Sequence, residues 1–327
     1  MAVKVPRLWL LRIVALVALV VAVVSAAVGV MGLDDDRARV PAPGRPAEKL
    51  VDGPVGDEGW FHSDCRFSHR AMDDPIVLPG RAGASHPHDF IGSRGTGSSS
   101  TNGSLRADPR STCVRDDEET NSSLPLADRS AYWTPTLLVD GHPVAPQGDV
   151  TAGYSVGPRD VTRIRPFPKD LRMIAGAPAG APPLLGEAVV YRARCGSGPP
   201  VAAGTQRTAP TCATPDLRVD INFPDCSNGQ ADSTDHKSHM AYSQPAADGS
   251  GRWVCPSTHP THVPRLSLKY RFATTGGPGV SLVTGDMSTT HADFMNGWDE
   301  ERLAELVRDC LGTDEYCGGT NSPVPGE

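Results

Sequence analysis

The stretch Leu217-Arg218-Val219-Asp220-Ile221-Asn222-Phe223 alternates apolar and polar residues, which is the pattern of a β-strand with one buried face. The stretch Arg265-Leu266-Ser267-Leu268-Lys269-Tyr270-Arg271-Phe272 repeats the same alternation. A sheet with one apolar face and one polar face is typical of antiparallel pairing. These two stretches therefore predict an antiparallel sheet with a core on one side.

Shorter stretches on both sides of these two strands combine apolar residues with flanking turn residues. The 31 prolines and 34 glycines predict many turns and few long helices. We therefore expect a mainly β domain, an antiparallel β-sandwich or jelly roll with long loops. The shorter strands are expected at residues 75–80, 131–139, 161–165, 171–174, 188–193 and 280–284.

One helix is predicted near the carboxyl end of the chain. The apolar residues between positions 303 and 310 recur at the spacing of one helical face. Asp299 is expected to cap the start of this helix, and Gly312 is expected to end it. Because the apolar stripe is narrow, the helix should lie on the surface of the sheet.

The chain has eight cysteines, all of them beyond the amino-terminal segment. An even number in an exported chain indicates disulfide bridges formed in an oxidising compartment. The sequence leaves the pairing open, although Cys310 with Cys317 and Cys226 with Cys255 are plausible pairs. A zinc cluster built from cysteines is the competing interpretation, and the absence of a Cys-x-x-Cys motif disfavours it.

The amino terminus carries an export signal. Lys4, Arg7 and Arg12 precede an apolar run at residues 13–33, which is long enough for a helix to cross about 30 Å of hydrocarbon. Acidic residues follow the run, so the charges predict that the rest of the chain lies outside the cell. Residues 1–33 are either an uncleaved signal anchor or a signal peptide cleaved near the small residues at 24–27.

Composition divides the remaining chain into three parts. Residues 34–58 are rich in aspartate and proline and are expected to form a disordered linker. Residues 59–318 are expected to form a single extracellular domain, and residues 319–327 a flexible tail. The domain should then be secreted or lie on the extracellular side of the membrane, with membrane contact through the amino-terminal segment only. The net charge of −7 and the lack of a basic stripe with interleaved aromatics exclude nucleic acid as a partner.

Most of the ten histidines lie in four short polar runs, which suggests that folding gathers them into one site. His86 and His88 are two residues apart, so an extended strand would point both imidazoles to one face, as in a chelating pair for zinc or copper. His291 and Asp293 share a face in the same way. The carboxylate could orient the imidazole or take part in proton transfer.

The other two runs have wider spacing. His236 and His239 are three residues apart, as are His259 and His262, and prolines place the second pair in a turn. For each pair, a role as a hydrogen-bonding anchor of a loop competes with a functional role. The residues predicted for catalysis are His88, His236, His239, His291 and Asp293, and those predicted to hold a divalent zinc or copper ion are His86, His88, His239, His262 and His291.

Other chemistry has less support in the sequence. Asp73 and Asp74 precede Pro75, and turn formation is favoured over catalysis for this pair. Neither Gly-x-Ser-x-Gly nor His-Glu-x-x-His occurs, so serine hydrolases of that type and zincin proteases are disfavoured.

A series of sequence blocks follows a fixed order along the chain. They are Asp73-Asp74-Pro75-Ile76-Val77, Ser85-His86-Pro87-His88-Asp89-Phe90, Ala131-Tyr132-Trp133-Thr134-Pro135, Phe223-Pro224-Asp225-Cys226, Asp235-His236-Lys237-Ser238-His239-Met240-Ala241-Tyr242, Cys255-Pro256 with His259-Pro260, and His291-Ala292-Asp293-Phe294-Met295-Asn296-Gly297-Trp298-Asp299. In these blocks the chain resembles an uncharacterised extracellular domain-of-unknown-function family of filamentous fungi and actinobacteria. The resemblance spans nearly all of residues 60–310 and implies secretion, but it implies no activity. Ser227-Asn228-Gly229 stands where fungal members often carry Trp-Asp-Gly.

Two functions of different classes fit these observations. The first is action on an extracellular polysaccharide, by hydrolysis or elimination, in a cleft rich in histidine and aspartate that could hold a divalent metal. The second is a non-catalytic module that binds glycan or metal at the cell surface, in which Trp60, Trp133 and Trp298 could stack on sugar rings. An extracellular glycan or cell-envelope polymer is the expected partner in both, and the sequence leaves open whether the protein is an enzyme.

Overall fold

The computed structural model describes residues 55–56, 58–113, 126–176, 184, 190–200, 202–203 and 207–319. The apolar run at residues 13–33, most of the predicted linker and residues 320–327 lie outside the described residues. Within the described part, no helix has both the length and the apolar character needed to cross a membrane.

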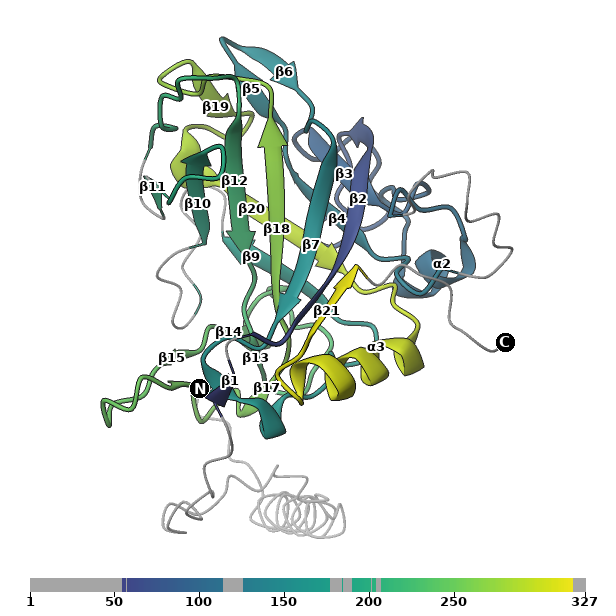
Figure 1. The fold of residues 1–327 in the computed structure, drawn as a ribbon. Coiled ribbons are helices and arrows are strands. Elements are labelled where there is room, and N and C mark those ends of the chain that lie inside the picture. Colours follow the sequence, from purple (N-terminus) through teal and green to yellow (C-terminus); the bar gives the residue numbers. More distant parts are fainter. Residues whose placement is uncertain are drawn as a thin grey trace, which may run out of the picture. The chain divides into compact units, whose positions relative to one another are not determined.

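The described residues form a mainly β fold around one curled sheet (Figure 1). All neighbouring strands of this sheet pair antiparallel, except for one short strand that runs parallel to β2. The order across the sheet is β11 (Ala202–Ala203), β10 (Tyr191–Cys195), β12 (Leu217–Asn222), β18 (Arg265–Phe272), β7 (Asp149–Ser155), β2 (Trp60–Ala71), β3 (His88–Gly92), β4 (Ala131–Pro135), β20 (His291–Met295) and β9 (Arg172–Gly176), with β21 (Tyr316–Gly319) as the parallel partner of β2. The predicted fold class is therefore confirmed as mainly β and antiparallel, whereas the finer sandwich or jelly-roll assignment stays a prediction.

The long strand β2 produces the curl. Its first half, from Trp60 to Arg66, pairs with β7, and its second half, from Phe67 to Ala71, pairs with β3. The register shifts between Phe67 and His69, which is an irregularity that lets a strand bend. One strand thus links a layer built from β10, β12, β18 and β7 to a layer built from β3, β4, β20 and β9.

The main core lies between these two layers. On β12 and β18 the apolar residues of the alternating pattern are buried, as the sequence predicts, while the polar residues between them point to the other face. Phe61, Tyr154 and Trp298 pack as aromatic pairs in this core, with ring centroids 4.8–6.0 Å apart. Their contacts connect the two layers into one apolar interior.

A second apolar cluster covers the outer face of the layer that contains β3, β4 and β20. Phe90, Trp133 and Met295 point into it from the strands, and Ile76 and Leu105 cover them from the connecting segments. These three strands are buried along their whole length because they have apolar neighbours on both faces. Their sequences therefore lack the clean alternation of β12 and β18.

The smaller elements surround this sheet. The short helix α2 (Asn102–Ala107) carries Leu105 into the second cluster, and α3 (Glu300–Leu306) continues as the π-helical turn η3 (Val307–Leu311). As predicted, Asp299 caps α3 by accepting from the Arg302 amide, and Gly312 ends the helical segment. The remaining strands form four small sheets: β1 (Val55–Gly56) with β8 (Arg159–Asp160), β14 (Met240–Ala241) with β13 (Cys226–Ser227) and β17 (Thr261–His262), β15 (Gln244–Pro245) with β16 (Trp253–Val254), and β19 (Val280–Leu282) with β5 (Leu137–Val139) and β6 (His142–Val144). Two 3-10 turns, η1 (Val161–Arg163) and η2 (Met287–Thr289), complete the described elements.

Two expected strands are wrong. Residues 75–80 form turns, because the Asp74 carboxylate accepts from the amides of Ile76 and Val77 and so curls the chain after it. Residues 161–163 form a 3-10 turn, because the Asp160 carboxylate accepts from the Thr162 amide. In both places a local side-chain hydrogen bond overrides the strand tendency of the apolar residues.

All eight cysteines form disulfides. The two plausible pairs, Cys226–Cys255 and Cys310–Cys317, are confirmed. The other two bridges are Cys65–Cys113 and Cys195–Cys212. Each bridge removes freedom from the unfolded chain, with a stabilisation of about 2–4 kcal/mol.

Candidate metal centre

The candidate site lies on the outer face of the layer that contains β3 and β20. His88 precedes Phe90 by two residues on β3, so it points to the face where Phe90 and Trp133 pack. His291 and Asp293 precede Met295 on β20 and point to the same face, as the sequence predicts for an extended segment. Strand periodicity alone therefore places these polar residues on one surface.

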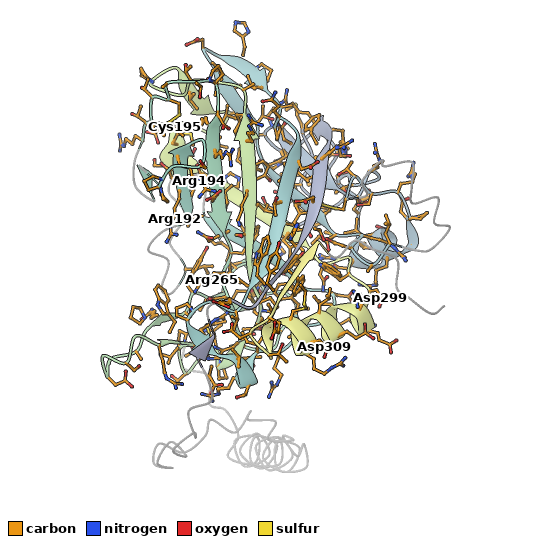
Figure 2. All side chains as sticks on the ribbon, viewed as in Figure 1. Arg192, Arg194, Cys195, Arg265, Asp299 and Asp309 are labelled. Atoms are coloured by element: carbon orange, nitrogen blue, oxygen red, sulfur yellow. A yellow bond between two sulfur atoms is a disulfide. The ribbon has the colours of Figure 1, made fainter. Side chains whose placement is uncertain are left out.

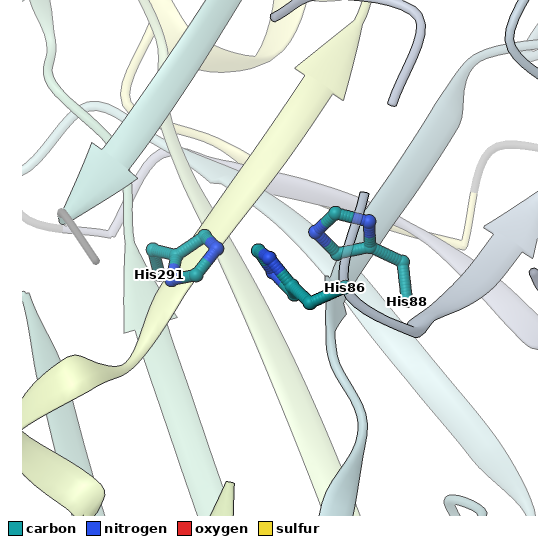
Figure 3. A group of neighbouring side chains, drawn as sticks. All are labelled: His86, His88 and His291. Carbon is teal, nitrogen blue, oxygen red and sulfur yellow. The ribbon is translucent and has the colours of Figure 1, made fainter. Parts of the chain in front are cut away.

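Three imidazoles meet there. His86, in the connection before β3, joins His88 and His291, and a ring nitrogen of each lies within 4.8 Å of one from the other two. The centroid of the His86 ring lies 4.2 Å from that of the His88 ring and 5.2 Å from that of the His291 ring. Figure 3 shows His86 between the other two rings, with ring nitrogens facing one another. We call this group the histidine cluster.

The backbone orients two of the three rings. His88 Nδ1 lies 2.9 Å from the Asp73 carbonyl oxygen, and His291 Nδ1 lies 2.9 Å from the Thr289 carbonyl oxygen. A carbonyl can only accept, so each Nδ1 must carry a proton, and in the neutral ring Nε2 keeps its lone pair. Buried Nε2 atoms of His86 and His88 have no hydrogen-bond partner among the described residues. Metal-binding histidines are held in this way, with one nitrogen anchored and the other free to bind.

Burial keeps these rings neutral. Burial and the neighbouring His86 ring lower the pKa of His88 to about 3, although the Asp73 carbonyl acts in the opposite direction. Burial likewise lowers the pKa of His291 to about 4, and it lowers the pKa of His86. Only neutral imidazole can bind a metal, so the cluster is in its binding form at neutral pH.

A buried carboxyl group lies beside the histidine cluster. Asp293 is 1% exposed, and its Oδ2 has no hydrogen-bond partner in the described part of the chain. Burial raises the pKa of Asp293 well above its usual range, and the charge of Asp74 raises it further, while Lys237 opposes the shift. Trp133 pairs directly with Asp293 across β4 and β20, and its buried Nε1 also has no partner within the described residues. The same face of β20 therefore carries a buried carboxyl group with a raised pKa, with an indole donor on the neighbouring strand β4.

A family described as "Domain of unknown function (DUF1996)" matches residues 74–298. The chain belongs to this family. The DUF1996 match covers the whole histidine cluster together with Asp293, and it includes every strand of the curled sheet except β2 and β21. Neither the curated proteins nor the solved structures give a match.

Two predicted site residues of the DUF1996 domain do not join the histidine cluster. His239 is buried, with Nδ1 2.9 Å from Ser233 Oγ and Nε2 2.7 Å from the Arg172 carbonyl oxygen, so both ring nitrogens are engaged. His262 lies on β17 in a separate three-stranded sheet, opposite Cys226. His239 therefore anchors a loop, which is the alternative that the sequence left open for its run. The buried Nδ1 of His262 has no hydrogen-bond partner among the described residues.

His236 lies at the margin of the site rather than in the histidine cluster. Its Nδ1 is 2.9 Å from Asp232 Oδ1. Burial raises the pKa of Asp74, and the electrostatic interaction with His236 opposes this shift. The next residue, Lys237, donates from Nζ to the Gly176 carbonyl oxygen at 2.7 Å, and Gly176 is the strand partner of His291. The sequence reasoning did not single out Lys237, although the residue lies between two histidines that it did select.

The low pKa values predict how stability depends on pH. His88, His262 and His291 have pKa values of about 3, 4 and 4 in the folded protein, against 6.5 for an ordinary histidine. Between these folded-state pKa values and pH 6.5, the unfolded chain therefore binds more protons than the folded protein does. The free energy of unfolding of the metal-free protein should consequently fall as the pH drops below 6.5. The slope is at most about 1.4 kcal/mol per pH unit for each group.

Urea unfolding between about pH 7 and about pH 4.5 measures this slope. The variant His88→Asn, whose amide can still donate to the Asp73 carbonyl, should show a shallower slope than the wild-type protein. His142→Asn changes an exposed histidine on β6 and serves as the control. An equal slope in His88→Asn and the wild-type protein would contradict the assignment of a depressed pKa to His88.

Proposed function

We propose that this domain binds a divalent zinc or copper ion at His86, His88 and His291 and uses the site on an extracellular polysaccharide, by hydrolysis or elimination. One observation carries the metal site: three neutral imidazoles face one another within 4.8 Å, two of them oriented by backbone carbonyls. Three nitrogen ligands leave a position open on a tetrahedral ion, which is the usual arrangement of catalytic rather than structural zinc sites.

The residues around the histidine cluster support proton transfer beside a metal. A bound divalent ion would supply Lewis acidity to an oxygen of the substrate. Burial raises the pKa of Asp293 well above its usual range, which is the property of a general acid, so Asp293 would donate a proton to a leaving oxygen. The Lys237 ammonium group donates to the carbonyl oxygen of Gly176, which is paired with His291 on the neighbouring strand, so it places a positive charge near His291.

The proposed location follows from the disulfides and the amino-terminal sequence. Four bridges among eight cysteines favour an oxidising compartment. The charge pattern around residues 13–33 supports export, with the domain either anchored on the extracellular side of the membrane or secreted. The proposed partner is an extracellular glycan or a cell-envelope polymer.

Product release from glycans tests the proposed activity. The metal-loaded protein should release reducing ends or unsaturated products from a panel of cell-envelope and plant polysaccharides. Asp293→Asn cannot donate the proton, so it should lower the rate by about 100-fold or more. Asp286→Asn, on the exposed start of η2, is the control. No turnover on any glycan by protein that contains bound metal would defeat the catalytic proposal.

A non-catalytic metal- or glycan-binding role is the second candidate. The observation that favours it is the enclosure of the site, because His88 is 0% exposed and His291 is 4% exposed. Trp133 and Trp298 are buried in the protein and therefore contribute to packing, not to sugar stacking. Retention of a glycan without product formation would select this role over catalysis.

A further inference from the structure

The polar face of the layer formed by β10, β12 and β18 carries a concentration of basic side chains. The apolar residues of these strands point into the core, so the residues between them point outward. Figure 2 shows Arg192 and Arg194 at the β10 side of this layer. Six cations lie on this surface, of which Arg265 pairs with the buried Asp225. The other five, which we call the basic face, are Arg192, Arg194, Arg218, Lys269 and Arg271.

Strand register aligns these cations in two rows. Arg194 lies opposite Arg218, and Arg218 lies opposite Arg271, so three arginines stand side by side on adjacent strands about 4.8 Å apart. The next row runs from Arg192 through Asp220 to Lys269. Like charges directly opposite each other destabilise a sheet. A row of three arginines is therefore not what stability alone would favour.

Carboxylates compensate only part of this charge. Asp216 accepts from Arg218 at 3.2 Å and from Arg271 at 2.8 Å, and Asp220 lies 3.0 Å from Arg194. Arg192 is exposed and lies opposite Asp220, which already pairs with Arg194. Five cations against two carboxylates leave a net charge of +3 on the basic face, in a chain whose net charge is −7.

We infer that the basic face binds an acidic polysaccharide of the uronic-acid type, with the polymer lying across the strands along the arginine row. Guanidinium groups bind carboxylates through paired N–H donors. The structure contains this interaction already, since Nε and a terminal nitrogen of Arg218 both bond to the Asp216 carboxylate. Asp216 and Asp220 occupy some of these donors, so a polymer carboxylate would bind the guanidinium N–H groups that they leave free and those of the exposed Arg192.

The chemistry of the basic face favours this polymer over a nucleic acid. Asn222 and Ser267 lie opposite each other one row beyond Asp220 and offer polar groups to sugar hydroxyls. The inference does not rest on the metal centre, whose residues belong to β3 and β20 in the other layer.

Binding of the full-length chain to sodium polygalacturonate tests the inference. Calorimetry and affinity electrophoresis should detect binding at about 50 mM salt and a marked loss at about 300 mM salt, because exposed charges are screened. The triple variant Arg194→Gln, Arg218→Gln, Arg271→Gln should bind at least about tenfold more weakly and with a smaller salt dependence. The single variant Arg271→Gln, at a side chain 49% exposed, should show a smaller loss in the same direction and covers the case in which the triple variant does not fold.

The matched control removes three arginines elsewhere. Arg110, Arg207 and Arg308 are exposed and each pairs with an aspartate, so Arg110→Gln, Arg207→Gln, Arg308→Gln makes the same change in net charge. This control should bind within about twofold of the wild-type protein. Equal losses in both triple variants, no binding by the wild-type protein, or equally tight binding of single-stranded DNA would overturn the inference. A chelator should leave binding unchanged, and loss of binding on metal removal would assign the polymer to the histidine cluster instead.

Discussion

Replacing His88 by alanine is expected to lower the zinc affinity of this protein by at least about 100-fold. Loss of a hydrogen-bonding partner behind a metal ligand typically costs 10–100-fold in affinity, and loss of a ligand itself should cost at least as much. His88 is fully buried, and the Asp73 carbonyl fixes its Nδ1 so that Nε2 faces the other two rings. Alanine at this position leaves only His86 and His291 to bind the ion.

Competition titration with a chromophoric chelator measures this affinity, and elemental analysis gives the number of ions bound. The wild-type protein should bind one zinc or copper ion per chain. His239→Ala is a matched control, because His239 is equally buried but both of its ring nitrogens bond to protein atoms outside the histidine cluster. If His239→Ala loses the ion while His88→Ala keeps it, the metal site has been placed on the wrong histidines.

Replacing Asp225 by alanine is expected to lower the free energy of unfolding by about 3–5 kcal/mol. Asp225 is buried between two arginines: Arg159 lies 3.4 Å and Arg265 lies 3.0 Å from its Oδ2. Its carboxylate also accepts from the amide and the hydroxyl of Ser243, at 2.7 and 2.8 Å. Alanine would leave the fully buried Arg159 guanidinium without a counter-charge, and an unpaired buried charge is among the most destabilising changes known.

Urea unfolding at neutral pH tests this expectation against an exposed ion pair. Asp149→Ala removes the partner of Arg66, and both of those side chains are more than 40% exposed. The loss in that control should stay below about 1 kcal/mol. Similar losses in the two variants would show that the buried network contributes no more than a surface pair.

The sequence predicted the strands best where one face of the sheet meets solvent. On β12 and β18 the polar residues alternate with apolar ones because the two faces have different environments. On β3 and β4 both faces are covered, so periodicity carries less information. The following Asp-Gly turn helped to identify the strand at residues 131–139, whereas β3 was not among the expected strands. The two wrong strands fail for another reason, since Asp74 and Asp160 form local hydrogen bonds that strand patterns do not reveal.

The candidate site was partly predictable. The pairs His86 with His88 and His291 with Asp293 were found from two-residue spacing, which is sufficient once the segments are extended. The sequence could not tell that these pairs meet while His239 and His262 do not. Each histidine pair has similar polar neighbours in the sequence. A histidine that anchors a loop therefore cannot be distinguished by its neighbours from one that belongs to the cluster.

Local chemistry alone determined which side of a strand each imidazole takes, where the carboxyl-terminal helix begins and that cysteines would cross-link the domain. Only the tertiary structure decided which imidazoles come together, because β4 must pair with both β3 and β20 to bring residues about two hundred positions apart into one cluster. In the other layer, the pairing of β12 with β10 and β18 aligned three arginines in one row. Register is a property of whole strands packed against a common core, so no single segment of the chain contains it.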